Sequence, residues 1–263
     1  MHEYFSAARF RRYFIKTVLE KPGQIGGIFL LSFAVALLIY FLLKSIANFE
    51  VAQLFSFTIG LIGGGCLLST VVFGYFSEIA SGASYLTLPA SRLEKWLCAI
   101  LIAGVIYTGC FLLYFRGLDS LFVHLYHLSL NHHDPRYTEQ YKSVFIFNFD
   151  GDTSLIFIFF ANAMAAMLVG SLYFNKSSFI KVALVVCGIY FFTFMMNYLF
   201  SSLLFKGIFR AFPFHSISIK NGVEEGILAL PTFWSNIYDA VAIYGLPAAL
   251  LIISFIRLTE KEI

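Results

Sequence analysis

Six long apolar stretches, separated by polar segments, dominate the pattern of hydrophobic and polar positions along the chain. A helix rises ~1.5 Å per residue and the hydrocarbon core of a bilayer is ~30 Å thick, so ~18 or more apolar residues with few charges are enough for one crossing. The stretches are continuously apolar, which favours helices, because the strands of a membrane barrel alternate apolar and polar residues. The pattern therefore predicts transmembrane helices at about 26–43, 51–76, 96–115, 154–174, 182–205 and 234–256.

Composition agrees with a chain that lives in a lipid bilayer. Of its 263 residues, 59% are hydrophobic and 13% are charged, whereas soluble domains carry about 25% charged residues. We expect an all-α polytopic membrane protein in which residues 1–263 form a single transmembrane domain. The net charge of +3 is modest, so no nucleic-acid partner is expected. All four cysteines fall within the predicted spans, so no disulfide framework is expected either.

Residues 1–23 predict an amphipathic helix ahead of the first span. On a helical wheel Arg9, Arg12, Lys16 and Glu20 share one face, and the opposite face is apolar and aromatic. A basic helix of this kind lies in the membrane interface, with its cations near anionic head groups. The alternative is a charged anchor that only sets the topology.

The distribution of Lys and Arg predicts the orientation. Six spans place both termini on one side, and that side carries eleven Lys and Arg residues against seven on the other, although its loops are shorter. Cytoplasmic loops carry the excess of positive charge. Both termini and the loop at 77–95 are therefore predicted to face the cytoplasm.

The loop at 77–95 is the most distinctive polar segment. Ser91 and Glu94 match a capping box, which predicts that the third helix begins at Ser91. Pro89 disfavours a helical conformation in the residue before it, so the chain should bend there. One interpretation is an ordinary tight connection with a good cap. The other is a docking element for a cytoplasmic protein, with the candidate residues Tyr85, Leu86, Leu88, Arg92 and Glu94.

At these residues the chain resembles the type-2 ATP-binding-cassette (ABC) export permeases. The shared features are an amphipathic leader, six spans, a short helical loop between spans two and three, and a broken outer segment before span six. The loop sequence Leu86-Thr-Leu-Pro-Ala-Ser-Arg-Leu-Glu-Lys95 is similar to that of small permeases from Bacteroidetes-like bacteria. The resemblance implies a permease of the bacterial inner membrane that forms a homodimer, or a heterodimer with a second permease. It also implies a separate ATPase subunit that docks on this loop.

The chain carries no ATP-binding motif of its own. A P-loop requires Gly-Lys-Ser/Thr, and that triplet does not occur in the sequence. The spans also contain no paired carboxylates and no nucleophile elbow. We therefore expect neither an enzyme nor a bound cofactor. The alternative to a permease is a non-transporting membrane scaffold or sensor component that holds another cytoplasmic partner.

The predicted outer loop at 116–153 is rich in histidine. A closed zinc site needs four converging ligands at defined spacing, and the histidines here show no such spacing. We expect interfacial histidines beside tyrosines and no metal site. The residues concerned are His124, His127, His132, His133 and Asp134.

The second outer loop, at 206–233, mixes aromatic residues with Gly and Pro. Phe209, Arg210 and Phe212 suit a short helix that dips into the outer interface. We consider them a possible gate in the path of cargo. The alternative is an interfacial aromatic belt, which is a general feature of membrane proteins.

Within the spans, one ionisable residue stands out. Asp239 lies near the outer end of the sixth predicted span, and such residues are costly in lipid. It could reach head-group water, or it could contact Asn197, Asn162 or cargo.

In the second span, Gly60 and Gly64 form a G-x-x-x-G pair that lets helices approach closely. A hinge or a pathway lining is the alternative interpretation.

Overall fold

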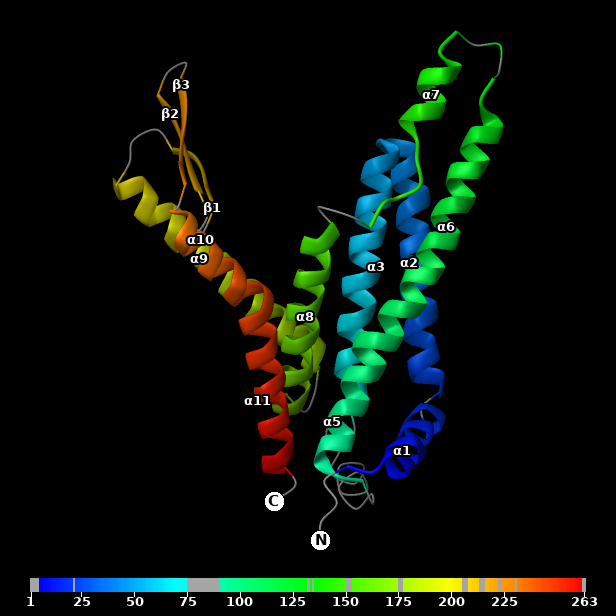
Figure 1. Ribbon diagram of the computed structural model, residues 1–263, viewed down its shortest axis with the longest axis vertical. Coiled ribbons are helices and arrows are strands. Elements are labelled where there is room, and N and C mark those ends of the chain that lie inside the picture. Colours follow the sequence, from blue (N-terminus) through cyan, green and yellow to red (C-terminus); the bar gives the residue numbers. More distant parts are fainter. Residues whose placement is uncertain are drawn as a thin grey trace.

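The chain is a polytopic membrane protein with six helices long and apolar enough to cross a bilayer, as predicted. They are seen in a computed structural model (Figure 1) as Pro22–Ile46, Phe49–Val72, Arg92–Ser129, Thr153–Tyr173, Ser178–Leu204 and Thr232–Lys261. The structure describes residues 5–20, 22–74, 90–131, 133, 135–149, 153–174, 177–204, 208–212, 216–221, 224–229 and 231–261.

Four of the crossings are single helices, namely α2 (Pro22–Ile46), α3 (Phe49–Val72), α8 (Thr153–Tyr173) and α9 (Ser178–Leu204). The third and sixth each contain a short π-helical segment. The third consists of α5 (Arg92–Ile100), the π-helix Leu101–Ile106 and α6 (Tyr107–Ser129). The sixth consists of α10 (Thr232–Ala240), the π-helix Val241–Gly245 and α11 (Leu246–Lys261).

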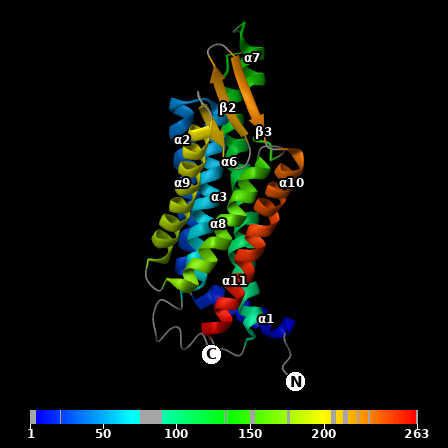
Figure 2. The same cartoon turned by 90° about the vertical axis from the view of Figure 1, so that its left-hand side faces the viewer.

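The crossings form two arms that meet at one end of the molecule and spread apart at the other (Figure 1), and one arm lies in front of the other when the molecule is turned by 90° (Figure 2). The first arm contains α1 (Ala7–Glu20), α2, α3 and the α5–α6 run, and the second contains α8, α9 and the α10–α11 run. We call the end where α1 and the end of α11 lie the base, and the other end the open end. At the base, Trp96 of α5 donates to Ser254 Oγ of α11 at 2.8 Å, which ties the two arms together.

The leader forms the expected amphipathic helix, which is α1. It ends just before the first span begins and lies across the base of the first arm (Figure 1). Its Tyr13 and Thr17 are buried, whereas Ile15 and Leu19 are exposed. Both described ends of the chain lie at the base, as an even number of crossings requires. That the base faces the cytoplasm remains the prediction from charge.

Glycines let α3 pack closely against α2 and α6. A Cβ atom on Gly64 would overlap the Tyr107 hydroxyl and would lie 2.5 Å from Ser32 Cβ. A Cβ atom on Gly60 would lie 2.6 Å from Phe111. The Tyr107 hydroxyl is fixed in place because it donates to the Gly60 carbonyl at 2.6 Å. The G-x-x-x-G pair therefore serves helix packing.

Replacing Gly64 with alanine is expected to destabilise the protein by about 1–3 kcal/mol, the usual cost of forcing extra volume into a packed core. Gly63 provides a matched control, since a Cβ atom there would meet nothing within 4 Å. Gly63→Ala should leave the unfolding temperature unchanged or slightly raised, because alanine favours helix. Thermal unfolding of the two variants in the same detergent makes the comparison. Equal unfolding temperatures would contradict the packing role of Gly64.

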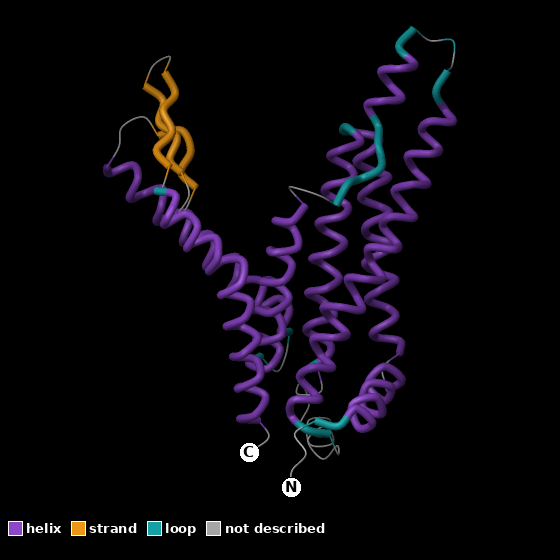
Figure 3. The backbone as a smooth tube through the Cα atoms, in the orientation of Figure 1, coloured by secondary structure: helices purple, strands orange, loops and turns teal. Residues whose placement is uncertain are grey.

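The third helix is longer than the sequence suggested, and the outer loop after it is correspondingly shorter. The predicted span ended at residue 115, whereas α6 continues to Ser129 and is followed by the short helix α7 (Tyr137–Ser143). Of the charged side chains that appeared to end the span, Asp119 is buried within the bundle and Arg116 is exposed. Residues 144–149 then run back along the first arm as an extended segment (Figure 3), which we call the strap.

The second outer loop contains a small antiparallel sheet, so the expected short helix is wrong. Its strands, in the order β1-β2-β3, are β1 (Ile208–Phe212), β2 (Ser216–Asn221) and β3 (Glu224–Ala229). The alternation of residues 216–220 and the Asn-Gly pair at 221–222 are the hairpin signals in this stretch. The three candidate gate residues lie on β1, and their side chains fall outside the described part of the structure.

Candidate functional site

Two buried carboxylates occupy opposite ends of the first arm. Glu94 lies at the base and Asp119 lies toward the open end, and both are 0% exposed. Burying a charged group is costly unless hydrogen bonds satisfy it. The contacts of these two side chains therefore show which parts of the chain are held together.

Glu94 completes the capping box that starts the third crossing. Its amide donates to Ser91 Oγ at 3.2 Å, and its Oε2 accepts from the Ser91 amide at 2.9 Å. The reciprocal pair satisfies amides that the first turn of a helix leaves without partners. The predicted start of the third helix and its cap are confirmed.

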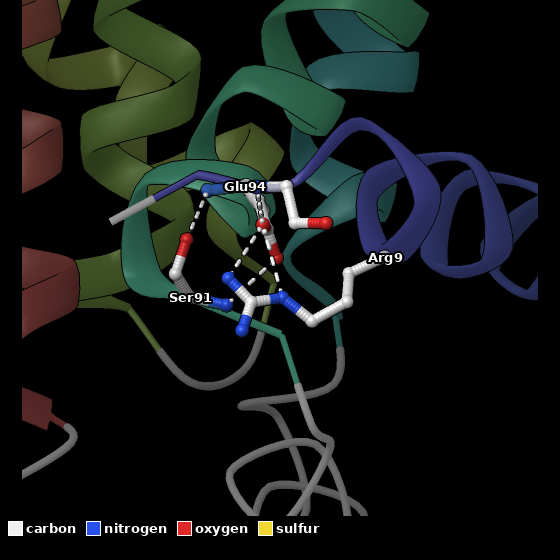
Figure 4. Close-up of polar contacts among 4 residues, drawn as sticks. Arg9, Ser91 and Glu94 are labelled. Carbon is white, nitrogen blue, oxygen red and sulfur yellow. Dashed lines mark hydrogen bonds and ion pairs between the residues drawn. The ribbon is translucent and has the colours of Figure 1, made fainter. Parts of the chain in front are cut away.

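The second oxygen of Glu94 binds the leader. Glu94 Oε1 accepts from the Ser6 amide at 2.7 Å and from Arg9 Nη2 at 3.2 Å (Figure 4). Arg9 therefore does not belong to a basic face directed only at head groups, because its guanidinium turns to Glu94 and its side chain is 38% exposed. A single buried carboxylate thus joins the N-terminal end of α1 to the first turn of α5.

The candidate docking residues divide into two groups. Tyr85, Leu86 and Leu88 lie outside the described residues, in the stretch that ends just before the cap. Arg92 is exposed on the first turn of α5. Glu94 was included as a docking residue, and this role is wrong, because a side chain with no exposed surface cannot contact a partner. Its place is in the first turn of α5, where it holds α1.

Replacing Glu94 with alanine should release α1 from the base. The change removes the acceptor of the Ser6 amide and of the Arg9 guanidinium, and hydrogen bonds to a charged group are worth about 1.5–3 kcal/mol each. Amide hydrogen exchange within Ala7–Glu20 is expected to accelerate by about tenfold or more. Glu139→Ala, at an exposed position on α7, is the matched control and should leave the exchange unchanged. Unaltered exchange in the Glu94 variant would show that α1 is held by packing alone.

Asp119 was missed by the sequence analysis because it fell in a predicted loop. Its Oδ1 accepts from the Tyr40 hydroxyl at 2.6 Å and from Gln53 Nε2 at 2.9 Å. Its Oδ2 accepts from the Phe147 amide at 2.7 Å. The carboxylate therefore links α2, α3, α6 and the strap. A helical repeat of apolar residues continues through this region and could have revealed the longer helix; it comprises Phe111, Phe115, Leu118 and Phe122.

Backbone groups of the strap form their hydrogen bonds with side chains of α3 and α6 rather than with a neighbouring strand. Gln53 Nε2 donates to the Phe145 carbonyl at 2.9 Å, and Arg116 Nη1 donates to the Phe147 carbonyl at 2.8 Å. With the bond from the Phe147 amide to Asp119, both ends of that residue are bound to α6. Val144 and Phe147 are buried. The strap is therefore held against the first arm by α3 and α6.

Of the histidines after the predicted third span, His127 packs against a tyrosine. His127 stacks on Tyr141 with ring centroids 4.0 Å apart, and its Nε2 lies 3.0 Å from the Val144 carbonyl oxygen. His124 lies one turn earlier on α6 and is exposed, whereas His132 and Asp134 are outside the described residues. Within the described part of the chain, no three His, Cys, Asp or Glu residues converge on one point.

The polar residues of the second arm do not form the contact that was considered for them. Asn162 Nδ2 donates to the Ala242 carbonyl at 3.1 Å, across from α8 to the π-helical segment of the sixth crossing. Asp239 is exposed and makes no hydrogen bond or ion pair with the described residues. Asn197 Nδ2 is buried without a described hydrogen-bond partner.

Comparison of the chain with protein-family models, with curated proteins and with solved structures finds no match. The resemblance to type-2 ABC permeases therefore depends on the topology and on the loop at 86–95. The arrangement at the base adds a physical link between that loop, α1 and the third crossing.

Proposed function

We propose that the chain is the permease subunit of an ABC-type exporter of a bacterial inner membrane. In this proposal it works as a dimer with a separate cytoplasmic ATPase that docks on the loop between α3 and α5. The observation that carries the proposal is the buried Glu94, which joins α1 and the first turn of α5 directly after that loop. A partner that pushes on the loop would therefore move α1 and the third crossing together.

The third crossing can carry such a movement to the other end of the molecule. It is one helical run of 38 residues, which at ~1.5 Å per residue is about 57 Å long. Asp119 and Arg116, in the second half of this run, hold the strap. The π-helical segment Leu101–Ile106 lies between the two ends, and such segments are frequent at functional positions in helices.

The second arm offers a surface for a second permease. In the most apolar windows of the fifth and sixth crossings only 6% and 11% of residues are buried, against 61% in the second crossing. Apolar helix faces of this kind are compatible with lipid and with another subunit, since helices in membranes associate through packing rather than through the hydrophobic effect. A dimer that uses α9 and the sixth crossing is therefore part of the proposal.

Affinity purification of the tagged chain from its native membranes tests the proposal. A nucleotide-binding subunit should co-purify in comparable amount, and the complex should hydrolyse ATP in a vanadate-sensitive manner. A control complex whose partner carries a P-loop lysine substitution should be inactive, because the chain has no P-loop. Recovery of a different cytoplasmic protein without ATPase activity would favour the scaffold alternative and would contradict the permease proposal.

A further inference from the structure

Arg116 places a guanidinium at a depth where the first arm lies within the bilayer. Two contacts on either side of Arg116 align α6 with α2 and so give its depth along the first arm. The Tyr114 hydroxyl donates to the Phe33 carbonyl at 2.8 Å, and the Tyr40 hydroxyl donates to Asp119 at 2.6 Å. Phe33 and Tyr40 precede the outer end of α2 by about 20 Å and about 9 Å at 1.5 Å per residue. α2 has 25 residues and, at about 37 Å, is only slightly longer than the ~30 Å hydrocarbon core. Arg116 is therefore well below the membrane surface.

The guanidinium has spare hydrogen-bonding capacity on an exposed face. Arg116 Nη1 donates to the Phe147 carbonyl at 2.8 Å, and the guanidinium carbon lies 5.9 Å from the centroid of the Phe149 ring. The residue is exposed, and its other N–H groups have no hydrogen-bond partner among the described residues. An ionised side chain facing acyl chains at this depth is costly. This face of α6 is therefore expected to meet water or a polar ligand.

The strap gives independent evidence for water on the same face. Non-helical backbone at membrane depth is tolerated only where it is buried in protein or lines a water-filled cavity. Phe147 is buried against the first arm, whereas Phe145, Ile146 and Asn148 are exposed. The strap itself lies in the half of the first arm nearer the open end, where the two arms spread apart (Figure 1). An extended segment with an exposed asparagine fits a water-filled space beside the strap, which we call the vestibule, and does not fit a lipid-facing surface.

The surroundings of Arg116 combine one cation with aromatic surface. Phe149 comes from the strap, and no carboxylate pairs with the guanidinium among the described residues. Asp119, one turn further along α6, is fully buried and bound by neutral donors, and Asp239 belongs to the other arm. A guanidinium matches carboxylate and phosphate groups through paired N–H donors.

We propose that Arg116 binds the anionic head group, a phosphate or carboxylate, of an amphipathic molecule whose apolar part lies along the strap. The proposal rests on the permease function only in that this molecule would be the cargo. The vestibule beside the strap is its binding site. The strap positions Arg116. Asp119 accepts from the Phe147 amide and Arg116 donates to the Phe147 carbonyl, so the guanidinium is held against the strap.

Photo-labelling in nanodiscs of phosphatidylcholine tests the ligand class without any ATPase. The probes are phosphatidic acid and phosphatidylcholine that carry the same photoreactive acyl chain, and labelled peptides are located by mass spectrometry. The phosphatidic acid probe should label the strap and α6 residues around Arg116 at least fivefold more strongly than the phosphatidylcholine probe. Arg116→Gln should remove this preference, and Arg116→Lys should retain part of it. Lys142→Gln, at an exposed position on α7, should change nothing.

Several results would overturn the proposal. Equal labelling by the two probes, or unchanged labelling of a folded Arg116→Gln variant, would exclude an anion site at Arg116. If inorganic phosphate fully prevented labelling by the phosphatidic acid probe, the apolar part of the ligand would contribute nothing to binding. Labelling that inorganic phosphate does not reduce would support an amphipathic ligand. Because these measurements use the chain alone, Arg116-dependent labelling without any co-purifying ATPase would leave the site standing and remove the exporter proposal.

Thiol accessibility tests the vestibule itself. In a background of Cys110→Ser and Cys187→Ser, Asn148→Cys should react rapidly with a water-soluble maleimide in nanodiscs. Leu38→Cys should react at least tenfold more slowly, since Leu38 is 56% exposed on α2 at a similar depth and faces lipid. Equal rates at the two positions would contradict a water-filled space beside the strap.

Discussion

Replacement of Asp119 by leucine is expected to be the most destabilising single change described for this protein. It leaves the Tyr40 hydroxyl, the Gln53 amide and the Phe147 amide without their acceptor, and each buried unsatisfied group costs about 1–3 kcal/mol. Three such groups together give an expected loss in the free energy of unfolding of about 3 kcal/mol or more. A thiol-reactive dye follows unfolding through the buried Cys66 and Cys98, in a background without the two exposed cysteines.

Asp119→Asn separates the two roles of this side chain. The asparagine oxygen can still accept from Tyr40 and Gln53, but its NH2 group would face the Phe147 amide, so two donors would meet. Amide exchange in residues 144–149 should increase while the unfolding temperature falls less than in the leucine variant. A leucine variant that unfolds at the wild-type temperature would show that Asp119 is not what joins the strap to the bundle.

Aspartate at both Leu86 and Leu88 is expected to abolish binding of the proposed ATPase. A buried leucine contributes about 1.5–3 kcal/mol to an interface, and two introduced charges would also have to lose their water. A loss of about 3 kcal/mol already corresponds to more than a hundredfold weaker binding. Recovery of the ATPase with the purified chain measures this loss. Ser81→Asp with Ser84→Asp adds the same charge to the same loop and should preserve binding. Equal recovery from both double variants would exclude Leu86 and Leu88 as docking residues.

The parts of the fold that depend on local patterns could be predicted from the sequence. Continuous apolar stretches define all six crossings, because length and hydropathy alone decide whether a helix can span a bilayer. The cap at Ser91 and Glu94 was also predictable, since its four residues are adjacent in the chain and its hydrogen bonds are local. The close packing at Gly60 and Gly64 followed from a short motif of the same kind.

Contacts between distant residues could not be predicted in this way. Arg116 and Asp119 appeared to end the third span because their charges are costly in lipid. Tyr40, Gln53 and the Phe147 amide satisfy Asp119, and the strap accepts one hydrogen bond from Arg116. The bond from Glu94 to Arg9 joins residues 85 positions apart, and no local pattern specifies such a pair. This distant contact, together with the burial of Glu94, changed its interpretation from a docking residue to a buried anchor of α1.

The outer sheet was missed for a different reason. Its aromatic and Gly-Pro composition was compared with interfacial helices, whereas the period-two alternation at 216–220 carried the better signal. The polar groups of the second arm were placed correctly within their crossings, but their partners were not. Asn162 donates to the Ala242 carbonyl in the π-helical segment of the sixth crossing. Sequence alone gives no reason to expect that carbonyl to accept a hydrogen bond from another helix.

An ATP-hydrolysing partner at the base is the core of the proposed function, and site-specific photo-crosslinking tests it most directly. A photoreactive phenylalanine analogue is placed either at Tyr85 in the predicted docking loop or at Tyr141, which is exposed on α7 at the opposite end. After irradiation of native membranes, the Tyr85 variant should form a crosslink to a nucleotide-binding subunit, and the Tyr141 variant should form none. A crosslink to that subunit from Tyr141, or its absence from Tyr85 while the ATPase still co-purifies, would contradict docking on this loop.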